Sequence, residues 1–378
     1  MGLQRINIKL TSCPSTFYLK FAMSLSAQQQ AGVREFVLQN VTKNPDTISA
    51  LTREKFGLSR TSFSNYMRDL VRDGLIIASG NTYARRYQLA KIVDINFTLG
   101  LYVGQSEDAI WRFRILPQIK NVKQNVIDIC QYGFTEMLNN AIDHSASKDA
   151  IIDYEQTYTT ISMAIIDHGV GVFDKIQRDF GLADAREALL ELSKGKLTSD
   201  KTKHSGEGIF FTSRMFDEFS IRSGYLFYSR ERTMSDGWDW FVETEDRPKY
   251  EIGTAVTMEI STSANWTMSE VYNRYQNEDG GFRKTHVPVK IGKYPGEQLV
   301  SRSQAKRILS RFEKFSEVLL DFDGVPEIGQ PFADEIFRVY NKDHPGVRVI
   351  AIRANPDVQR MIDQVRAAAS DEEANAIT

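Results

Sequence analysis

Apolar and polar residues follow different periods along the chain, and these changes predict a multidomain α/β protein. Three short helical patterns and two short strands come first, followed by a long amphipathic helix and apolar strands. Strands alternate with helices near the end, as in a small parallel or mixed sheet. A polar, glycine-bearing stretch before that last part is expected to be an irregular linker. The expected divisions are a leader over residues 1–22, a mainly helical unit over 23–91, an α/β unit over 92–265, the linker over 266–296 and a small α/β unit over 297–378.

The segment FTEMLNNAIDHS, residues 134–145, is the most informative part of the sequence. It has the pattern of an amphipathic helix, with Glu136, Asn140 and Asp143 on one face and apolar residues on another. A carboxylate and a carboxamide one turn apart can together hold Mg²⁺ through oxygen atoms and position a water molecule. Glu136 is therefore a candidate catalytic carboxylate, and Asn140 is a candidate metal ligand.

A short apolar strand over residues 161–166 follows and ends in Asp167, Gly169 and Gly171. An acid at the end of a strand can accept a hydrogen bond from an exocyclic amine, and neighbouring glycines let the backbone approach a flat ring closely. Taken alone, each pattern is common, because Glu/Asn pairs occur on solvated helix faces and Asp-x-Gly-x-Gly occurs in turns. Their order and separation together indicate a nucleotide site.

The two segments resemble, in this order, the N box and the first glycine box of the GHKL ATP-binding superfamily. This superfamily includes gyrase, heat-shock chaperones, histidine kinases and the mismatch-repair ATPases. The wording NAIDH, residues 140–144, is most similar to the anti-sigma-factor serine kinase branch. Downstream, SGEGIFF (205–211) resembles the second glycine box, where backbone N–H groups that open a helix bind phosphates. GTAVTMEI (253–260) resembles the closing Gly-Thr strand.

The resemblance implies an α/β-sandwich GHKL domain that uses ATP and Mg²⁺. Within it, Glu136 would be the general base for water or for an incoming hydroxyl, and Asn140 would hold the metal. A Walker P-loop is not a competing interpretation, because Gly195-Lys196 is followed by Leu197. The implied nucleotide contacts are Asn140, Asp143, Asp167, Gly169, Gly171, Gly206, Gly208, Ile209 and Thr254.

A cationic, polar stretch precedes the second glycine box and resembles the ATP lid of this superfamily. Residues 173–203 contain one expected helix, over 183–192, and then Lys194, Lys196, Lys201 and Lys203. These lysines are candidates for neutralising phosphate charge, and a solvated flexible loop is the alternative.

Near the N-terminus, three short helices and a β-hairpin resemble a winged helix-turn-helix. The third helix, over residues 60–72, has Ser59 as its expected cap, and two strands flank Gly80-Asn81. Basic residues outnumber acidic ones here, which favours binding to the phosphates of double-stranded DNA; a protein-contact or dimer module is the alternative. The expected DNA contacts are Arg60, Thr61, Ser62, Asn65, Arg68, Arg85 and Arg86.

The C-terminal run VLLDFDGVPEIGQPFADE, residues 318–335, resembles STAS-like domains, which have the anti-sigma-antagonist fold. In antagonists that are regulated by phosphorylation, the loop after this strand carries a hydroxyl group. The corresponding stretch 327–331 contains neither Ser nor Thr. We therefore expect this domain to be a docking surface for an unknown protein partner and not a phosphate acceptor.

Composition adds that this is an ordinary globular chain with a formal net charge of −2 at pH 7. Its two cysteines, Cys13 and Cys130, are far apart in sequence, which indicates a reducing compartment without a disulfide framework. No apolar run approaches the length of a membrane span, and the N-terminus lacks the pattern of a signal peptide. We expect a cytoplasmic protein without membrane contact, with residues 1–22 disordered and Met23 as an alternative start.

Three functions stay open on the sequence alone. The first is an ATP-dependent regulator that couples nucleotide state to DNA binding and partner docking. The second is a serine kinase acting on a separate partner, and the third is a nucleotide sensor without turnover. Glu136 favours turnover over binding alone. A histidine kinase is disfavoured, because none of the five histidines lies on a dimerising helix ahead of the ATP-binding domain. A homodimer is also an open alternative.

Overall fold

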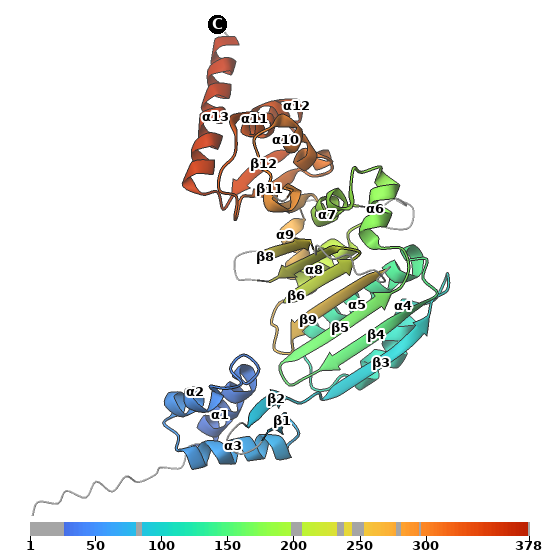
Figure 1. Ribbon diagram of the computed structural model, residues 1–378, viewed down its shortest axis with the longest axis vertical. Helices are drawn as coiled ribbons and strands as arrows, with labels where there is room; N and C mark the ends of the chain where they lie inside the picture. Colours follow the sequence, from blue (N-terminus) through green and yellow to red (C-terminus); the bar gives the residue numbers. More distant parts are fainter. Residues whose placement is uncertain are drawn as a thin grey trace, which may run out of the picture. The chain divides into compact units, whose positions relative to one another are not determined.

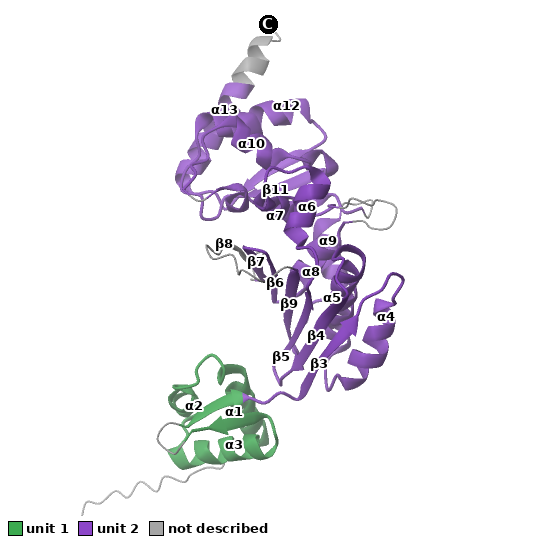
Figure 2. Cartoon of the chain, turned by 45° about the vertical axis from the view of Figure 1, so that its right-hand side comes forward, with its two compact units in different colours: residues 1–88 green, residues 89–378 purple. Residues whose placement is uncertain are grey.

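The chain divides into two compact units, residues 1–88 and 89–378 (Figure 2). A computed structural model describes residues 26–80, 85–197, 206–232, 238–243, 253–276, 281–294 and 296–376. The expected leader, residues 1–22, lies outside this part of the chain. Within the described residues, a large antiparallel sheet and a smaller parallel sheet are combined with helices. This arrangement confirms the predicted multidomain α/β fold.

The N-terminal unit packs helices against one another and against a short strand. Its elements are α1 (Ala27–Asn40), α2 (Ile48–Phe56), α3 (Arg60–Arg72), β1 (Ile76–Ser79) and β2 (Arg86–Leu89). Val33, Met67 and Leu70 are almost completely buried, which gives these short helices a shared apolar core. The predicted cap of the third helix is confirmed, because the Ser62 N–H donates to the Ser59 hydroxyl at 3.0 Å. Strand β1 pairs with β2.

The larger unit is built on a sheet in which neighbouring strands run antiparallel (Figure 1). In sheet order its strands are β3 (Val93–Gly100), β4 (Asp149–Gln156), β5 (Thr160–Asp167), β9 (Thr254–Ser261), β6 (Glu218–Ser223), β7 (Leu226–Glu231) and β8 (Trp238–Glu243). Alternate residues of β4 and β5 are buried, which is the pattern of a sheet covered by helices on one face. Strand β9 lies between β5 and β6, so Thr254 stands opposite Asp167.

Helix α5 (Gln124–His144) packs on this sheet and contacts β5 and β9. Phe134, Leu138 and Ala141 lie on its buried face. The amphipathic helix predicted over residues 134–145 is therefore confirmed as the C-terminal half of α5. The other helical segments of this part are α4 (Glu107–Ile110), η1 (Trp111–Ile115), η2 (Leu116–Gln118), α6 (Val172–Phe180), α7 (Ala185–Lys194), α8 (Gly208–Met215) and α9 (Met268–Tyr275).

The segment between β5 and α8 differs from the sequence expectation of one helix over residues 183–192. The structure has two helices there, α6 and α7. Gly181 ends α6 with a left-handed φ of 62°, and the Asp184 carboxylate caps α7 by accepting from the N–H groups of Arg186 and Glu187 at 2.9 and 3.0 Å. In the sequence, Gly181 and Asp184 were the local signals that one helix ends and another begins between residues 180 and 185.

The C-terminal domain, residues 281–376, contains a parallel sheet, as the alternation of strands and helices predicted. In chain order its elements are β10 (Lys284–Pro288), η3 (Val289–Gly292), α10 (Arg302–Leu309), η4 (Phe312–Lys314), β11 (Glu317–Asp321), α11 (Gln330–Asp334), η5 (Glu335–Tyr340), α12 (Asn341–Asp343), β12 (Arg348–Ile352) and α13 (Pro356–Ala376). The strand order is β10-β11-β12.

The expected irregular linker, residues 266–296, requires a correction. It contains α9, and it contains β10, which is a strand of the C-terminal sheet. His286 and Val287 in this strand are buried, and Val287 is opposite Leu320 of β11. The strand is short and is flanked by lysines and glycines, so its sequence does not have a clear strand pattern. Pairing with β11 determines its conformation.

Candidate functional site

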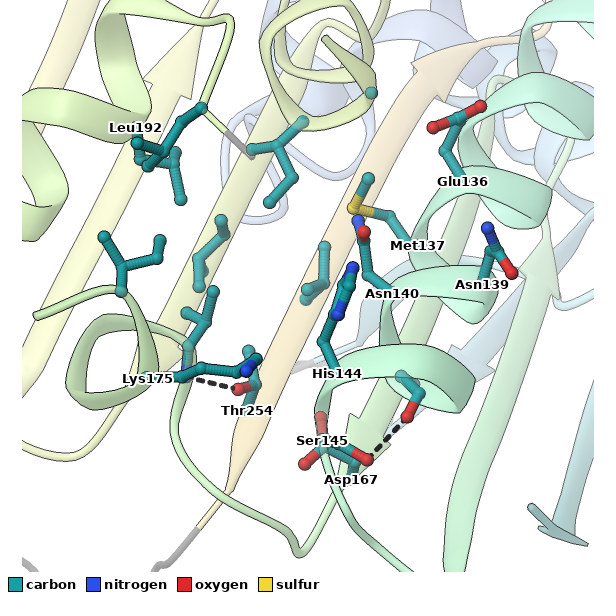
Figure 3. A pocket seen from close by; sticks show the side chains of 18 of the residues that line it. Glu136, Met137, Asn139, Asn140, His144, Ser145, Asp167, Lys175, Leu192 and Thr254 are labelled. Atoms are coloured by element: carbon teal, nitrogen blue, oxygen red, sulfur yellow. Dashed lines mark hydrogen bonds between the residues drawn. The ribbon is translucent and has the colours of Figure 1, made fainter. Parts of the chain in front are cut away.

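A cavity of about 290 Å³ opens between α5, α6, the start of α8 and the strands β5 and β9. Figure 3 shows Glu136, Asn140 and His144 following one another along α5, with Asp167, Lys175 and Thr254 towards the end of the cavity away from Glu136. Segments far apart in the sequence therefore meet at one site. The predicted residues that line it are Glu136, Asn140, Asp167, Gly206, Gly208, Ile209 and Thr254.

The wall formed by α5 places one predicted residue differently from expectation. Asn140 and His144, one helical turn apart, line the cavity, whereas Asp143 is exposed and is not among the lining residues. Lining positions on α5 recur at an interval of four residues from Glu136, so His144 occupies the place that was expected for Asp143. The expected nucleotide contact of Asp143 is not supported by this geometry.

Asp167 is a buried acid at the end of β5, with 6 % of its surface exposed. Its Oδ1 accepts the Gly169 N–H at 2.9 Å. Burial raises the pKa of Asp167, and hydrogen bonds from the backbone of Gly169 and Thr254 oppose this shift. A buried carboxylate at the wall of a cavity can accept a hydrogen bond from a bound molecule.

The turn after Asp167 is held by close backbone contacts. A Cβ atom on Gly169 would overlap the Ser145 carbonyl oxygen, and one on Gly171 would overlap the Ser223 hydroxyl. Neither glycine is among the described residues that line the cavity. A side chain at either position would prevent the close packing of this turn. Thr254 fixes the turn further, because its Oγ1 accepts the Val172 N–H at 3.1 Å at the start of α6.

The second predicted glycine segment also lines the cavity. Gly206 has a left-handed φ of 71°, and its carbonyl accepts the Leu197 N–H at 3.2 Å. Gly208 opens α8 and packs against the Glu136 carboxylate. Backbone N–H groups at this helix start can donate to an anion. Ser205, at the head of the segment, lies outside the described residues.

Lys175 is a cavity residue that the sequence analysis missed. It lies on α6, and its Nζ is 2.9 Å from Asp179 Oδ2, one turn later; both residues line the cavity. The pattern VFDKIQRDF, with apolar residues at positions 172, 173, 176 and 180, was the available signal for this amphipathic helix. Lys175 therefore supplies the cavity with a cation.

The lysines expected to neutralise phosphate take other partners where the structure describes them. Lys194 is buried, and its Nζ lies 2.6 Å from Glu191 Oε1 and 2.8 Å from the Ser310 carbonyl oxygen. Lys196 Nζ donates to the Lys314 carbonyl oxygen at 3.0 Å. For these two lysines the phosphate role is corrected to a structural one. Lys201 and Lys203 lie outside the described residues.

Five of the predicted DNA contacts are on α3 and two, Arg85 and Arg86, are at the start of β2. The side chain of Ser62 takes part in the helix cap, with its Oγ 2.9 Å from Ser59 Oγ. Arg86 is exposed and forms an ion pair with Asp46 at 3.3 Å. The exposed members of the set are Arg60, Thr61, Asn65, Arg68, Arg85 and Arg86.

Across the described part of the chain, no helix combines the length and the apolar character needed to cross a membrane. A family model for a histidine kinase-like ATPase domain matches residues 111–226, from η1 to the start of β7. A second model, for a STAS-like domain of unknown function, matches residues 304–359. No curated protein matches the chain. The cavity residues on α5, β5 and α8 fall inside the first match, and the chain therefore carries a histidine kinase-like ATPase domain followed by a STAS-like domain.

Proposed function

We propose that the chain is a regulatory protein that binds Mg-ATP in the cavity between α5 and α8 and hydrolyses it. The observation that carries this proposal is a single cavity lined both by the buried acid Asp167 and, farther along α5, by the Glu136 carboxylate. The match to a histidine kinase-like ATPase domain supports the nucleotide-binding role.

The adenine would occupy the end of the cavity at Asp167. One oxygen of this carboxylate is engaged by the Gly169 N–H, and the carboxylate can accept a hydrogen bond from the exocyclic amine. Ile165 and Ile176 line the same cavity and offer apolar surfaces to a flat ring. Gly171 and Thr254 would contribute by holding the turn that carries Asp167.

The phosphates would lie towards Glu136. The carboxamide oxygen of Asn140 is a suitable ligand for a hard cation such as Mg²⁺, which when bound neutralises phosphate charge. The N–H groups of Gly208 and Ile209, at the start of α8, would donate to phosphate oxygens. Glu136 would then take the proton from an attacking water or from an incoming hydroxyl.

The flanking parts would make the nucleotide site regulatory. The three helices and paired strands of the N-terminal unit support a winged helix-turn-helix, whose exposed arginines on α3 and at β2 would contact double-stranded DNA. The STAS-like domain would dock an unknown protein partner. A cytoplasmic location is part of the same proposal, and a homodimer stays an open alternative.

The test is an equilibrium titration of the full chain with Mg-ATP, followed by measurement of phosphate release with and without DNA. Asn140→Ala should weaken Mg-ATP binding by about tenfold or more, which is about 1.4 kcal/mol, because the metal loses its protein ligand. The matched control is Asn139→Ala, which removes a neighbouring carboxamide that also borders the cavity. Equal affinity of wild type and Asn140→Ala would refute the proposed site.

The same experiment distinguishes the other functions. Transfer of labelled phosphate from ATP to a protein in cell extract would identify the serine kinase. Tight binding without phosphate release or transfer under any condition would identify a nucleotide sensor.

A further inference from the structure

Helix α7 is buried on every side along its C-terminal half, and it also lines the cavity. Every residue from 188 to 195 is buried, including the charged side chains of Glu191 and Lys194. A helix that is buried all round lies between two packed bodies. Helix α7 contacts α6 and α8 on one side, and β10 and η3 of the C-terminal domain on the other. Figure 1 shows α7 beside that domain.

One side of this segment forms part of the nucleotide cavity. Leu192 of α7, Leu197 just after it and Phe180 at the end of α6 all line the cavity. Leu197 is also tied to the second glycine segment by its hydrogen bond to Gly206. A shift of this segment would therefore change the shape of the cavity.

The other side is attached to the C-terminal domain by a buried ionic cluster. Glu191 lies between two cations, because its Oε1 is 2.6 Å from Lys194 Nζ and its Oε2 is 3.2 Å from Arg311 Nη1. Two further hydrogen bonds cross the contact: Lys194 donates to the Ser310 carbonyl oxygen at 2.8 Å, and Arg311 donates to the Lys196 carbonyl oxygen at 2.6 Å. Burying charges is tolerable only when they are paired and hydrogen-bonded in this way.

Arg311 belongs to the STAS-like domain and makes the widest set of these contacts. Besides Glu191 and the Lys196 carbonyl, its guanidinium lies 5.4 Å from the ring centroid of Phe180. It therefore touches α6, α7 and the residues that follow α7. Its backbone has a left-handed φ of 65°, a conformation that is costly for a residue with a side chain.

Two further contacts attach the same segment at other points. The Tyr294 hydroxyl donates to Asp184 Oδ2 at 2.6 Å, at the cap of α7. Lys196 Nζ lies 4.9 Å from the ring centroid of Phe315 and donates to the Lys314 carbonyl oxygen. The C-terminal domain thus holds both ends of α7.

We propose that Arg311 is a positioning residue for the ATP cavity, through which the STAS-like domain controls nucleotide affinity. This inference rests on the proposed function. Arg311 contacts one side of the segment 191–197, and the other side of this segment lines the cavity. Docking of the STAS-like domain and binding of nucleotide therefore stabilise the same position of this segment. Coupling of this kind is reciprocal, so a partner that pulls the STAS-like domain from α7 weakens ATP binding, and ATP strengthens the docking.

The chain offers a substitution that tests this without leaving a charge unpaired. In Arg311→Ala, Glu191 keeps its partner Lys194, so the buried carboxylate is still neutralised. In Arg311→Lys, the charge stays but the flat, multiply donating guanidinium is replaced. The matched control is Arg302→Ala in the same domain, because Arg302 pairs with Asp334 at 3.1 Å on α11, away from the cavity segment.

The experiment measures the Kd of the full chain for Mg-ATP and, where ATP is turned over, KM and kcat. Arg311→Ala should raise Kd and KM by about 5- to 150-fold, the usual range for coupling between two sites, with a much smaller change in kcat. Arg311→Lys should recover part of the affinity, and Arg302→Ala should bind as wild type does. Tyr294→Phe, which removes only the hydroxyl at the α7 cap, should shift Kd in the same direction by a smaller factor.

The outcomes separate the two levels of inference. Wild-type protein that fails to bind Mg-ATP refutes the proposed function itself. Wild-type protein that binds, together with Arg311→Ala that binds equally or more tightly, overturns the positioning role. An equal loss of affinity in Arg302→Ala also overturns it, because the effect would then be general damage to the domain. Circular dichroism of each variant checks that the secondary structure is retained.

Discussion

The carboxylate of Glu136 on α5 lies against Gly208, the first residue of α8, so closely that a Cβ atom on Gly208 would overlap Glu136 Oε2. Helices α5 and α8 are brought together at this point. A side chain at residue 208 would therefore have to displace the carboxylate of the proposed general base. The absence of a side chain there also leaves the backbone at the start of α8 free to approach a phosphate.

Gly208→Ala should therefore impair turnover without removing any catalytic group. The added methyl displaces the Glu136 carboxylate, and a misplacement of roughly 1 Å can cost about 10²-fold in rate. The control is Gly100→Ala at the end of β3, where a Cβ atom meets no other atom within 4 Å. Phosphate release measured at saturating Mg-ATP compares the two variants. Wild-type turnover in Gly208→Ala would show that this contact does not position the base.

Glu136→Ala should separate hydrolysis from binding. Removal of a positioned general base slows turnover by about 10²–10⁴-fold, whereas the proposed adenine contact at Asp167 would be unaffected. We expect Mg-ATP to stay bound to this variant in titrations while phosphate release falls. If Glu136→Ala hydrolyses ATP as fast as the wild type, this carboxylate is not the base.

The sequence was most informative where a local pattern determines structure. The period of residues 134–145 predicted the second half of α5, and Ser59 identified the start of α3. At the site, Asp167 and Thr254 are opposite each other on paired strands, as expected for two segments of one nucleotide site. Only the family resemblance placed both residues in one site, because more than eighty residues separate them in sequence, and the pairing of their strands was not predicted.

The features that could not be predicted depend on contacts between distant segments. Lys194 resembles a solvated lid lysine in the sequence, but the structure buries it beside Glu191 because the C-terminal domain covers that side of α7. Strand β10 acquires its conformation from β11. His144, and not the predicted Asp143, lines the cavity. Which of the two residues faces the cavity depends on how α5 is rotated about its axis against the sheet, and helical spacing alone does not determine that rotation.

Asp167→Asn should weaken ATP binding while making the unliganded protein more stable near neutral pH. Burial raises the pKa of Asp167, so its charged form lowers the stability of the folded protein. The neutral amide of Asn does not have this effect, and its oxygen can still accept the Gly169 N–H. The wild type loses stability through this group as pH rises from about 4, the usual pKa of Asp, through the raised pKa of the folded state. Thermal midpoints across pH should therefore converge for the two proteins below about pH 4.

The same substitution also tests which nucleotide base the cavity prefers. Wild-type protein should prefer ATP to GTP, because Asp167 would accept a hydrogen bond from the adenine amine, and Asp167→Asn should lose that preference. Equal affinity of the wild type for ATP and GTP would contradict the assignment, whatever the stability result.

The N-terminal unit should bind duplex DNA with an affinity that falls steeply as salt rises, because phosphate contacts release counterions. Arg85 and Arg86 are exposed, and Arg60 and Arg68 are exposed on α3. Mobility shifts of the full chain on genomic fragments, from low to moderate salt, measure this dependence. Absence of a shift at low salt would identify the unit as a protein-contact module.

Substitutions within this unit should divide into two classes. Replacing Arg85 and Arg86 by Ala should weaken binding to all sequences alike and reduce the salt slope by about 0.9 for each DNA phosphate that is no longer neutralised. Asn65→Ala, on the exposed face of α3, should instead change which sequence is preferred, since an amide side chain in the major groove reads base edges. The control replaces Arg112 and Arg348, whose side chains are 63 % and 76 % exposed elsewhere on the chain, and so removes the same charge. An equal loss of affinity in that control would mean that net charge, and not a DNA-binding surface on the N-terminal unit, accounts for the binding.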